Sequence, residues 1–253
     1  MKKITVVTVC YNCEELIERT IKSVLSQTIF NDIQYIIIDG ASTDNTLSII
    51  NKYKHEIDIV ISEKDSGIYN AMNKGIDHSE SEWIIFMNAG DEFFSNNALE
   101  SVFKRDESFE EASIIGCETF FKTPRGNFIE KIKSVEERWI CIPACHQSML
   151  IRTSIHKQYK FDESWKICSD HFNFNKIINE GYKFLGVKTV LSVFSFDGVS
   201  AKNRIALYQE KKKIAILLNS PFIEKVKLTL IIFRLKLVRW IKSKFKTNPM
   251  GSF

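Results

Sequence analysis

Between residues 83 and 92 the chain reads Trp83-Ile84-Ile85-Phe86-Met87-Asn88-Ala89-Gly90-Asp91-Glu92, an apolar run that leads directly into a polar, acidic turn. An uninterrupted apolar run is typical of a strand buried between two layers of helices. Ligands of such α/β proteins bind beyond the carboxyl ends of the strands, where this turn lies. Asp91 and Glu92 are therefore candidates to hold a divalent cation against a phosphorylated ligand, because hard cations prefer carboxylate oxygen. Alternatively, the two acids cap the helix expected near Ala98.

The same arrangement of an apolar run and a polar turn occurs upstream. Residues 4–9 lead into a turn that carries Tyr11, and residues 35–38 lead into a turn that carries Asp39. Apolar residues at helical spacing separate these runs, and a third strand is expected over residues 57–61. Because strand and helix alternate, we expect parallel strands with right-handed crossovers. The turns after the strands should then converge on one edge of the sheet.

Four blocks of the sequence resemble the family 2 glycosyltransferases of the GT-A fold, in residues, order and spacing. The blocks are Thr5–Asn12, Ile38–Thr46, Asp65–Gly75 and the turn Asn88–Asp91. Together with the region around Asp170 they extend over roughly the first 200 residues, the usual size of a large single domain. The resemblance implies an α/β fold with a Rossmann-like mixed sheet flanked by helices.

The resemblance also implies that the first turns hold the nucleotide of a sugar donor. Tyr11 is expected to lie against the uracil ring and Asp39 to accept a hydrogen bond from the base N–H, a combination that suits a pyrimidine. Thr8 and Asp65 are assigned to the same nucleotide site. Taken singly, Tyr11 could be a half-buried loop aromatic, and Asp39 a cap or Asx-turn residue. Asp44 is interpreted as the N-cap of the following helix.

The acidic turn departs from the family pattern. The family's Asp-x-Asp signature falls on Asn88 and Gly90, which leaves Asp91 as the acid of the turn. We expect Asn88 to contact the ribose or a metal-bound water, and Asp91 to bind the metal, with Glu92 as a second candidate. A single carboxylate predicts weak binding of Mn2+ or Mg2+, mainly through the donor diphosphate. Metal independence is the alternative.

Lys74 and Arg152 are the cations expected to meet phosphate oxygens. Fixed positive charge stabilises a leaving group that gains negative charge during the reaction. The alternative for Lys74 is a solvated lysine near a helix end.

A second set of residues resembles the acceptor half of the same family. Asp170 lies at the start of a helix that is expected to end at Gly181, and it corresponds to the catalytic base. A base at this position takes a proton from an acceptor hydroxyl. The Glu that often precedes the base in the family is Ser169 here. The alternative for Asp170 is an ordinary N-cap.

Three further residues are assigned to the acceptor site by the resemblance. His146 and Gln147 are expected to bind sugar hydroxyls or a diphosphate, and His171 to orient the acceptor. Either histidine could instead be structural. The sequence contains no His-Glu-x-x-His motif and no paired Cys-x-x-Cys set, so zinc is not expected.

Positive charge is concentrated near the C-terminus. Residues 211–246 contain eleven Lys and Arg and one acid, Glu224, a net charge of +10 in a chain of net charge +4. The charges interrupt every apolar run before about 18 residues, so a transmembrane helix is not expected. We predict a basic amphipathic helical extension over residues 206–253 that lies on the anionic membrane, with Trp240 and Phe245 near the headgroups. The alternatives are a helix packed on the catalytic domain and a nucleic-acid arm, but no nucleic-acid-binding fold is recognisable and no nucleic acid is expected as a partner.

The simplest organisation is a catalytic domain over residues 1–205 that is followed by this extension. Its nucleotide-sugar half would cover about residues 1–95 and its acceptor half about residues 96–205. The six cysteines are scattered, and no secretory signal precedes the first strand. We therefore expect reduced thiols and a cytoplasmic protein at the inner face of the cell membrane.

The resemblance implies an inverting hexosyltransferase. Residues 65–75, 146–147 and 196–200 resemble most the bacterial O-antigen, capsule and colanic-acid enzymes. The expected donor is UDP-Gal, UDP-Glc or an N-acetyl derivative, and the expected acceptor is a glycan on a polyprenyl diphosphate. Two other classes remain open: a nucleotide-sugar-binding scaffold without catalysis, and a membrane-surface interaction protein.

Overall fold

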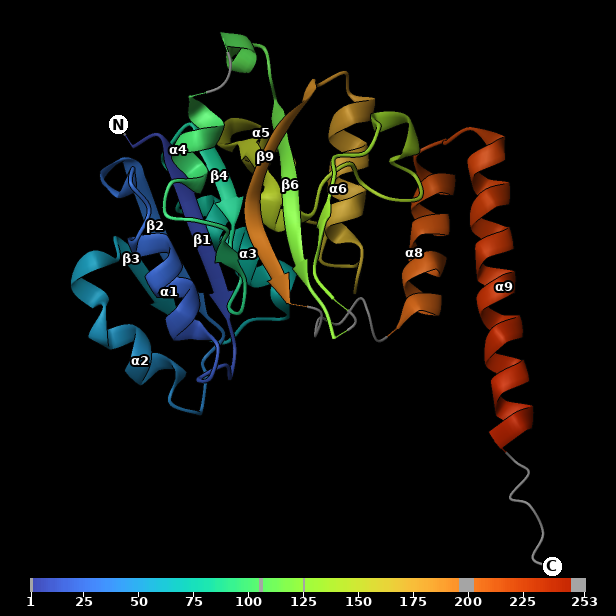
Figure 1. Ribbon diagram of the computed structural model, residues 1–253, viewed down its shortest axis with the longest axis horizontal. Coiled ribbons are helices and arrows are strands. Elements are labelled where there is room, and N and C mark those ends of the chain that lie inside the picture. The colour runs from blue at the N-terminus through green and yellow to red at the C-terminus, as the bar shows by residue number, and fades with distance from the viewer. Residues whose placement is uncertain (1, 105–106, 125, 196–202, 247–253) are drawn as a thin grey trace, which may run out of the picture.

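The computed structural model describes residues 2–104, 107–124, 126–195 and 203–246. A mixed sheet forms its centre, helices cover both faces, and the two C-terminal helices extend beyond one end of the sheet (Figure 1). Two predictions, those for the block at residues 196–200 and for the side chain of Phe245, concern parts of the chain that lie outside the described residues.

The described residues form a nine-stranded sheet in the order β3-β2-β1-β4-β8-β6-β9-β5, with β7 paired to β6. The strands are β1 (Ile4–Cys10), β2 (Ile33–Asp39), β3 (Ile59–Ser62), β4 (Trp83–Phe86), β5 (Glu92–Phe93), β6 (Ile114–Lys122), β7 (Phe128–Glu130), β8 (Met149–Arg152) and β9 (Phe184–Ser195). The first four strands are parallel to one another, as predicted. Strand β8 is antiparallel to both β4 and β6, which makes the sheet mixed.

The helices are α1 (Ile17–Leu25), α2 (Thr46–Lys52), α3 (Ile68–Asp77), α4 (Ala98–Phe103), α5 (Thr153–Gln158), α6 (Ser169–Asn179), α8 (Arg204–Leu217) and α9 (Phe222–Lys246). The N-cap of helix α2 is Asn45 and not Asp44, the residue predicted from the sequence, although the Asp44 carboxylate accepts the N–H of Thr46, the first residue of the helix, at 3.0 Å. Helix α6 ends at Asn179, and Gly181 follows with φ +89°, a backbone conformation that suits glycine.

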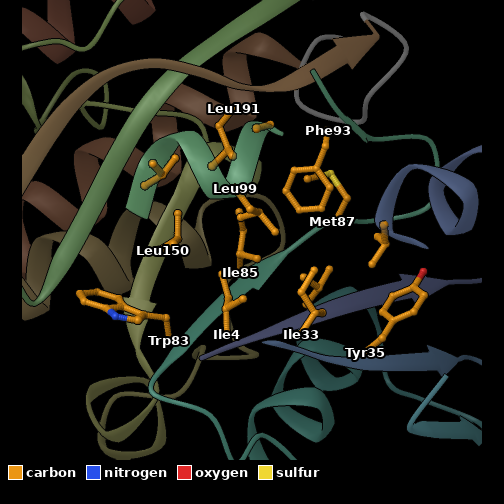
Figure 2. Close-up of a cluster of buried hydrophobic side chains, with 14 of the residues drawn as sticks. Ile4, Ile33, Tyr35, Trp83, Ile85, Met87, Phe93, Leu99, Leu150 and Leu191 are labelled. Atoms are coloured by element: carbon orange, nitrogen blue, oxygen red, sulfur yellow. The ribbon is translucent and has the colours of Figure 1, made fainter. Parts of the chain in front are cut away.

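Side chains of the parallel strands alternate between two apolar clusters, one on each face of the sheet. Ile33, Tyr35 and Ile37 pack with α1, α2 and α4, whereas Ile36 and Ile38 pack with α3, α5 and α6. Figure 2 shows the first cluster, in which the labelled side chains include Ile4, Trp83, Ile85, Leu99 and Leu150. The central strands β1, β2 and β4 are covered on both sides, and all their residues are buried.

The two C-terminal helices differ in how they are packed. In α8, Ile214 packs with Phe172 of α6, and Ala215 packs with Trp139 and with Leu228 of α9. Helix α9 lies along α8 and is the outermost element of the molecule (Figure 1). None of the described helices combines the length and apolar character needed to cross a bilayer. The predicted extension therefore contains one helix packed on the sheet domain and one that is largely exposed.

Gly75 allows α3 to lie directly on β1. A Cβ atom at this position would be 2.4 Å from Cγ1 of Val7, which is fully buried. Gly75→Ala should therefore destabilise the protein by about 1–3 kcal/mol through overpacking, despite the better helix propensity of alanine. The free energy of unfolding, measured by urea denaturation, tests this.

Removing the γ-methyl groups of Val7 provides the control. In a Val7→Ala background, Gly75→Ala should cost less than in the wild type, because the new Cβ then has space. Equal costs in the two backgrounds would show that the close approach of α3 and β1 does not limit stability.

Candidate functional site

The turns that follow β1 and β2 lie side by side. Cys10 and Asp39 are register partners in the parallel ladder, so both strands end at the same level. The Asn12 N–H donates to Ser42 Oγ at 2.9 Å, and the Thr43 N–H donates to Asn12 Oδ1 at 2.8 Å. Asn12 has a positive φ of 46°, which asparagine tolerates better than most residues. These cross-turn hydrogen bonds hold the two turns together.

Two residues predicted for the nucleotide site, Tyr11 and Asp65, meet around Gly40. A Cβ atom on Gly40 would lie 2.5 Å from Asp65 Oδ2 and 3.3 Å from Tyr11 Cδ2, so only glycine fits without a shift. The Tyr11 side chain is 61% exposed, which leaves its ring accessible to a planar base. Asp65 also accepts the Gly67 N–H at 2.9 Å, which shapes the turn before α3. The structure thus brings Tyr11, Gly40 and Asp65 together.

Asp39 lies beneath this surface. It is fully buried, and its carboxylate accepts hydrogen bonds from the Ser62 hydroxyl at 2.6 Å, from the Ser42 hydroxyl and from the Ser42 N–H at 3.1 Å. Both carboxylate oxygens are therefore engaged within the protein. A base N–H would reach Asp39 only after one of the two serine hydroxyls turned away.

Two other residues predicted for donor binding are engaged elsewhere. Thr8 is fully buried in β1, where its hydroxyl lies 3.1 Å from the Tyr35 hydroxyl, so its side chain is not available to a nucleotide. Thr8 was predicted to reach the nucleotide site, but a polar residue within an apolar strand can find its hydrogen-bond partner inside the core. Lys74 Nζ lies 2.8 Å from Glu63 Oε1 and 3.2 Å from the Lys64 carbonyl oxygen. A phosphate would have to replace Glu63 at this lysine.

The turn after β4 contacts the second half of the molecule. Asn88 Nδ2 lies 3.1 Å from Nε2 of His146, which belongs to a single 3-10 turn over His146–Ser148. Burial lowers the pKa of His146, and the nearby Asp170 carboxylate partly opposes this shift. A neutral imidazole can accept the Asn88 amide N–H. The Oδ1 atom of Asn88 is buried and has no partner among the described residues, so it can accept from a ligand or bind a cation.

Asp170 is in the first turn of α6 and is half-buried. Within the described part of the chain, no hydrogen bond or ion pair engages its side-chain carboxylate. The Tyr69 hydroxyl of α3 donates to the Ile167 carbonyl at 2.8 Å, which fixes the segment before α6 against the donor half. The structure thus gathers Asn88, His146 and Asp170 at the junction of the two halves.

Gln147 and His171 are buried beside this junction. Their side chains are 1% and 2% exposed, and neither Gln147 Nε2 nor either ring nitrogen of His171 has a partner among the described residues. Burial lowers the pKa of His171 well below its usual value, and the charge of Lys211 in α8 adds to the shift. Lys211 belongs to α8, so His171 lies close enough to this helix for the charge of Lys211 to act on it. Direct contact between His171 and an acceptor would require a rearrangement of these layers.

The acidic turn provides few groups for a metal. Asp91 is 8% exposed, and burial raises the pKa of its carboxyl to about 7, although the charge of Arg19 opposes the shift. Glu92 lies in β5 with its carboxylate 3.7 Å from Arg19 Nε. Across the described ranges, no three His, Cys, Asp or Glu side chains gather to hold a metal. Asp91 and the unpartnered Asn88 Oδ1 fit a hard cation only if a ligand supplies further oxygens.

Arg152 is far from this turn. It pairs with Trp83 at the amino end of β4, its guanidinium lies 4.6 Å from the Trp83 ring centroid, and it donates to Glu82 and to the Ala112 carbonyl at 2.7 Å each. Asn88 follows the opposite end of the same strand. The prediction of a phosphate contact for Arg152 is wrong. Strand β8 runs antiparallel to β4, so its last residue, Arg152, lies at the amino end of β4 and not at the carboxyl end, which Asn88 follows.

Glu163 was not singled out from the sequence, yet it joins the two halves of the site. Its carboxylate accepts from the Ser66 hydroxyl at 3.0 Å, from Asn70 Nδ2 at 3.2 Å and from Asn73 Nδ2 at 3.0 Å. The hydrogen bond from Asn73, together with those from Asn70 and Ser66, lowers the pKa of Glu163, although burial opposes the shift. Asn70 and Asn73 are spaced three apart on α3, a signal that they face one common partner.

Glu210 of α8 holds the segment that leads to the candidate base. Its carboxylate accepts the N–H groups of Lys166, Ile167 and Cys168 at 3.0 to 3.1 Å. These three residues immediately precede α6, and the hydrogen bonds satisfy N–H groups at its entrance. Glu210 therefore positions the first turn of α6, which carries Asp170.

Glu163→Ala should raise the KM for the donor several-fold, because the turn around Asp65 loses its anchor to the acceptor half. The side chain is exposed, so the melting temperature should change little. Ser164→Ala, at the exposed neighbouring residue, is the control and should leave both quantities unchanged. Unchanged KM in Glu163→Ala, or a loss of stability without a change in KM, would mean that these contacts do not organise the donor site.

Comparison with known proteins identifies the family of this site. A model of glycosyl transferase family 2 matches residues 5–177. The minor teichoic acid biosynthesis protein GgaB of Bacillus subtilis (strain 168) is 31% identical over 193 residues, which is 70% of this chain and 21% of that protein. The poly(ribitol-phosphate) beta-N-acetylglucosaminyltransferase TarP of Staphylococcus aureus (strain N315) is 36% identical over 120 residues, 46% of this chain and 36% of that protein. The chain thus spans between about a fifth and about a third of the length of these relatives.

Solved structures with the same arrangement have low sequence identity. Residues 1–349 of S. aureus TarS, in complex with UDP-GlcNAc, superpose with a TM-score of 0.69 at 18% identity, over 91% of this chain and 70% of that one. The mannosyltransferase PcManGT from Pyrobaculum calidifontis, in complex with GDP-Man and Mn2+, also gives a TM-score of 0.69 at 18% identity, over 91% and 69% of the two chains. Because the family model covers more than half of the chain and the sheet has the arrangement of these structures, the chain belongs to glycosyltransferase family 2 and has the predicted GT-A fold.

Proposed function

We propose that the protein transfers a hexose, with inversion, from a UDP-sugar to a hydroxyl group of a lipid-linked glycan during the assembly of a bacterial surface polymer. The observation that carries the proposal is the junction of Asn88, His146 and Asp170, where an unengaged carboxylate lies next to the contact between the donor turns and the acceptor half. The names of GgaB and TarP support a role in cell-surface polymer synthesis. The reaction would take place at the inner face of the cell membrane.

The donor half would comprise residues 1–95 and the acceptor half residues 96–205, followed by the extension over residues 206–253. The exposed ring of Tyr11 next to Gly40 and Asp65 suits a uracil base. The UDP-GlcNAc complex of TarS supports a UDP-sugar as donor, preferably UDP-Gal, UDP-Glc or an N-acetyl derivative.

In the proposed mechanism, Asp170 takes the proton from the acceptor hydroxyl as the oxygen attacks the anomeric carbon. The attack comes from the face opposite the UDP, so an α-linked donor gives a β-linked product. His146 is half-buried and neutral, and it would bind an acceptor hydroxyl or diphosphate oxygen next to the base. Lys74 would exchange Glu63 for a phosphate oxygen as negative charge develops on the UDP.

A divalent cation, Mn2+ or Mg2+, is part of the proposal. Asp91 and Asn88 Oδ1 would hold it together with diphosphate oxygens, and the cation would neutralise charge on the departing UDP. The Mn2+ in the PcManGT complex supports a cation in this fold. Glu92 is the second candidate ligand.

Asp170→Asn should reduce transfer by at least about a hundredfold while UDP affinity changes little, because the amide keeps the shape but cannot accept the proton. Glu180→Gln, an exposed acid just after the same helix, is the matched control and should transfer normally. Transfer to a synthetic lipid diphosphate acceptor, read by mass spectrometry and anomeric NMR, measures the rates. Transfer by Asp170→Asn within a few-fold of wild type would remove Asp170 from the mechanism, and UDP binding without any transfer by the wild type would favour a non-catalytic scaffold.

The metal dependence can be tested through the acidic turn. Asp91→Ala should lower turnover and raise the Mn2+ concentration required, whereas Glu92→Ala should matter less. Because burial raises the pKa of Asp91 to about 7, protons compete with the metal below that pH. The Mn2+ concentration needed for half-maximal rate should therefore fall as the pH rises through 7. Full activity in excess EDTA would exclude this cation site and leave Lys74 as the group that stabilises the leaving phosphate.

A further inference from the structure

Helix α9 exposes a row of large apolar side chains. The row, called the apolar stripe below, consists of Phe222, Leu230, Phe233, Leu237, Trp240 and Ile241, whose side chains are 39–79% exposed. Their spacing of three, four and seven residues puts them on one face of the helix. A different face of α9 packs on α8 through Leu228 and Glu224, which are buried. The stripe therefore takes no part in holding α9 to the rest of the molecule.

Basic residues border the apolar stripe on both sides. At 100° per residue, Lys225 and Lys236 fall on one side of the stripe, and Lys227 and Arg234 on the other. Lys227 is ion-paired with Glu224 at 2.7 Å. For Lys225, Lys236 and Arg234, the described residues provide no acidic partner.

A shallow groove of about 300 Å³ opens between α8 and α9 at the first turns of the stripe. It is lined by Lys212, Phe222, Lys225, Val226, Thr229 and Leu230. Two lysine side chains therefore border a mostly apolar groove. This combination suits a molecule that carries a phosphate next to a hydrocarbon chain.

We propose that α9 lies flat on an anionic phospholipid surface, with the apolar stripe in the headgroup region and a lipid phosphate between Lys212 and Lys225. Apolar burial and the attraction of the flanking lysines to anionic lipid add in this arrangement. The proposal rests on the proposed location at the membrane and assigns the contacting face. A second copy of the chain is a poorer occupant, because an isologous dimer on this stripe would bring rows of positive charge together, in a region of net charge +10. A nucleic acid would leave the stripe uncovered.

The test uses the full chain and co-sedimentation with vesicles of phosphatidylglycerol and phosphatidylcholine, with pure phosphatidylcholine vesicles as a comparison. Phe233→Gln/Leu237→Gln should lower binding to the anionic vesicles by roughly tenfold or more, since two apolar anchors are lost. Val238→Gln is the matched control: Val238 is 42% exposed against 43% for Leu237, but lies about 100° around the helix, off the stripe. Glutamine favours helix, so the circular dichroism of both variants should match the wild type.

Charge and insertion are measured separately. Lys212→Gln/Lys225→Gln should weaken binding to anionic vesicles and leave the weak binding to phosphatidylcholine unchanged. Added salt should also weaken binding to the anionic vesicles, because exposed charges are screened over about 8 Å at physiological ionic strength. Trp240 fluorescence should shift to the blue on binding, and Trp240→Phe should remove the shift, because Trp83 and Trp139 are buried before binding and the half-buried Trp165 lies outside α9.

Three results would overturn the proposal. They are equal vesicle binding by the Phe233→Gln/Leu237→Gln variant and the wild type, equal loss in the Val238→Gln control, and a change in oligomeric state in the stripe variant with vesicle binding retained. The last result would assign the stripe to a second copy of the chain. The vesicle-binding measurement does not depend on catalysis. If the wild type failed to transfer sugar, that result would therefore contradict the proposed function but not the proposed membrane contact. The stripe variant should still transfer sugar to a short soluble acceptor at the wild-type rate.

Discussion

The site depends on one constraint, the parallel pairing of β1 with β2 on one side and with β4 on the other. Strands that run in the same direction end at the same edge of a sheet, so the turns with Tyr11, Asp39 and Asn88 become neighbours. The register is narrowly fixed because both faces of these strands are buried, and a slip by one residue would turn every side chain to the opposite face. The backbone pairing of these strands therefore brings together the turns that are proposed to bind the nucleotide.

Local signals in the sequence were sufficient to predict this part of the molecule. Apolar runs predicted β1, β2 and β3, and polar residues after them predicted the turns that converge around Gly40. The third strand begins at Ile59 rather than at residue 57, a small error at an element boundary. Arg152 was placed wrongly because its position depends on the direction of β8, which is set by distant pairing and leaves no local signal.

Partners of polar side chains were harder to predict than strands. The hydroxyl that meets Thr8 comes from the neighbouring strand, and the hydroxyls that cover Asp39 come from Ser42 in the following turn and from Ser62 at the end of β3. Glu163 was missed because its partner Ser66 is 97 positions away in the chain. Part of the pKa shift of His171 comes from Lys211 in α8, which follows α6 by more than twenty residues. Such contacts form only when the helices pack on the sheet. Local sequence patterns therefore predict which polar side chains are present near the site, but not whether those side chains are accessible to a ligand.

Glu210 has a consequence for how this chain can be divided. The carboxylate belongs to a helix that a boundary at residue 205 would remove, yet it accepts three N–H groups at the entrance to the helix of Asp170. A truncated or recombined protein that lacks α8 would leave those donors without their carboxylate and uncover the apolar contacts of Phe172. Recombination between related enzymes should consequently keep α8 together with α6, whereas α9, which contributes one buried leucine to this packing, can be exchanged more readily.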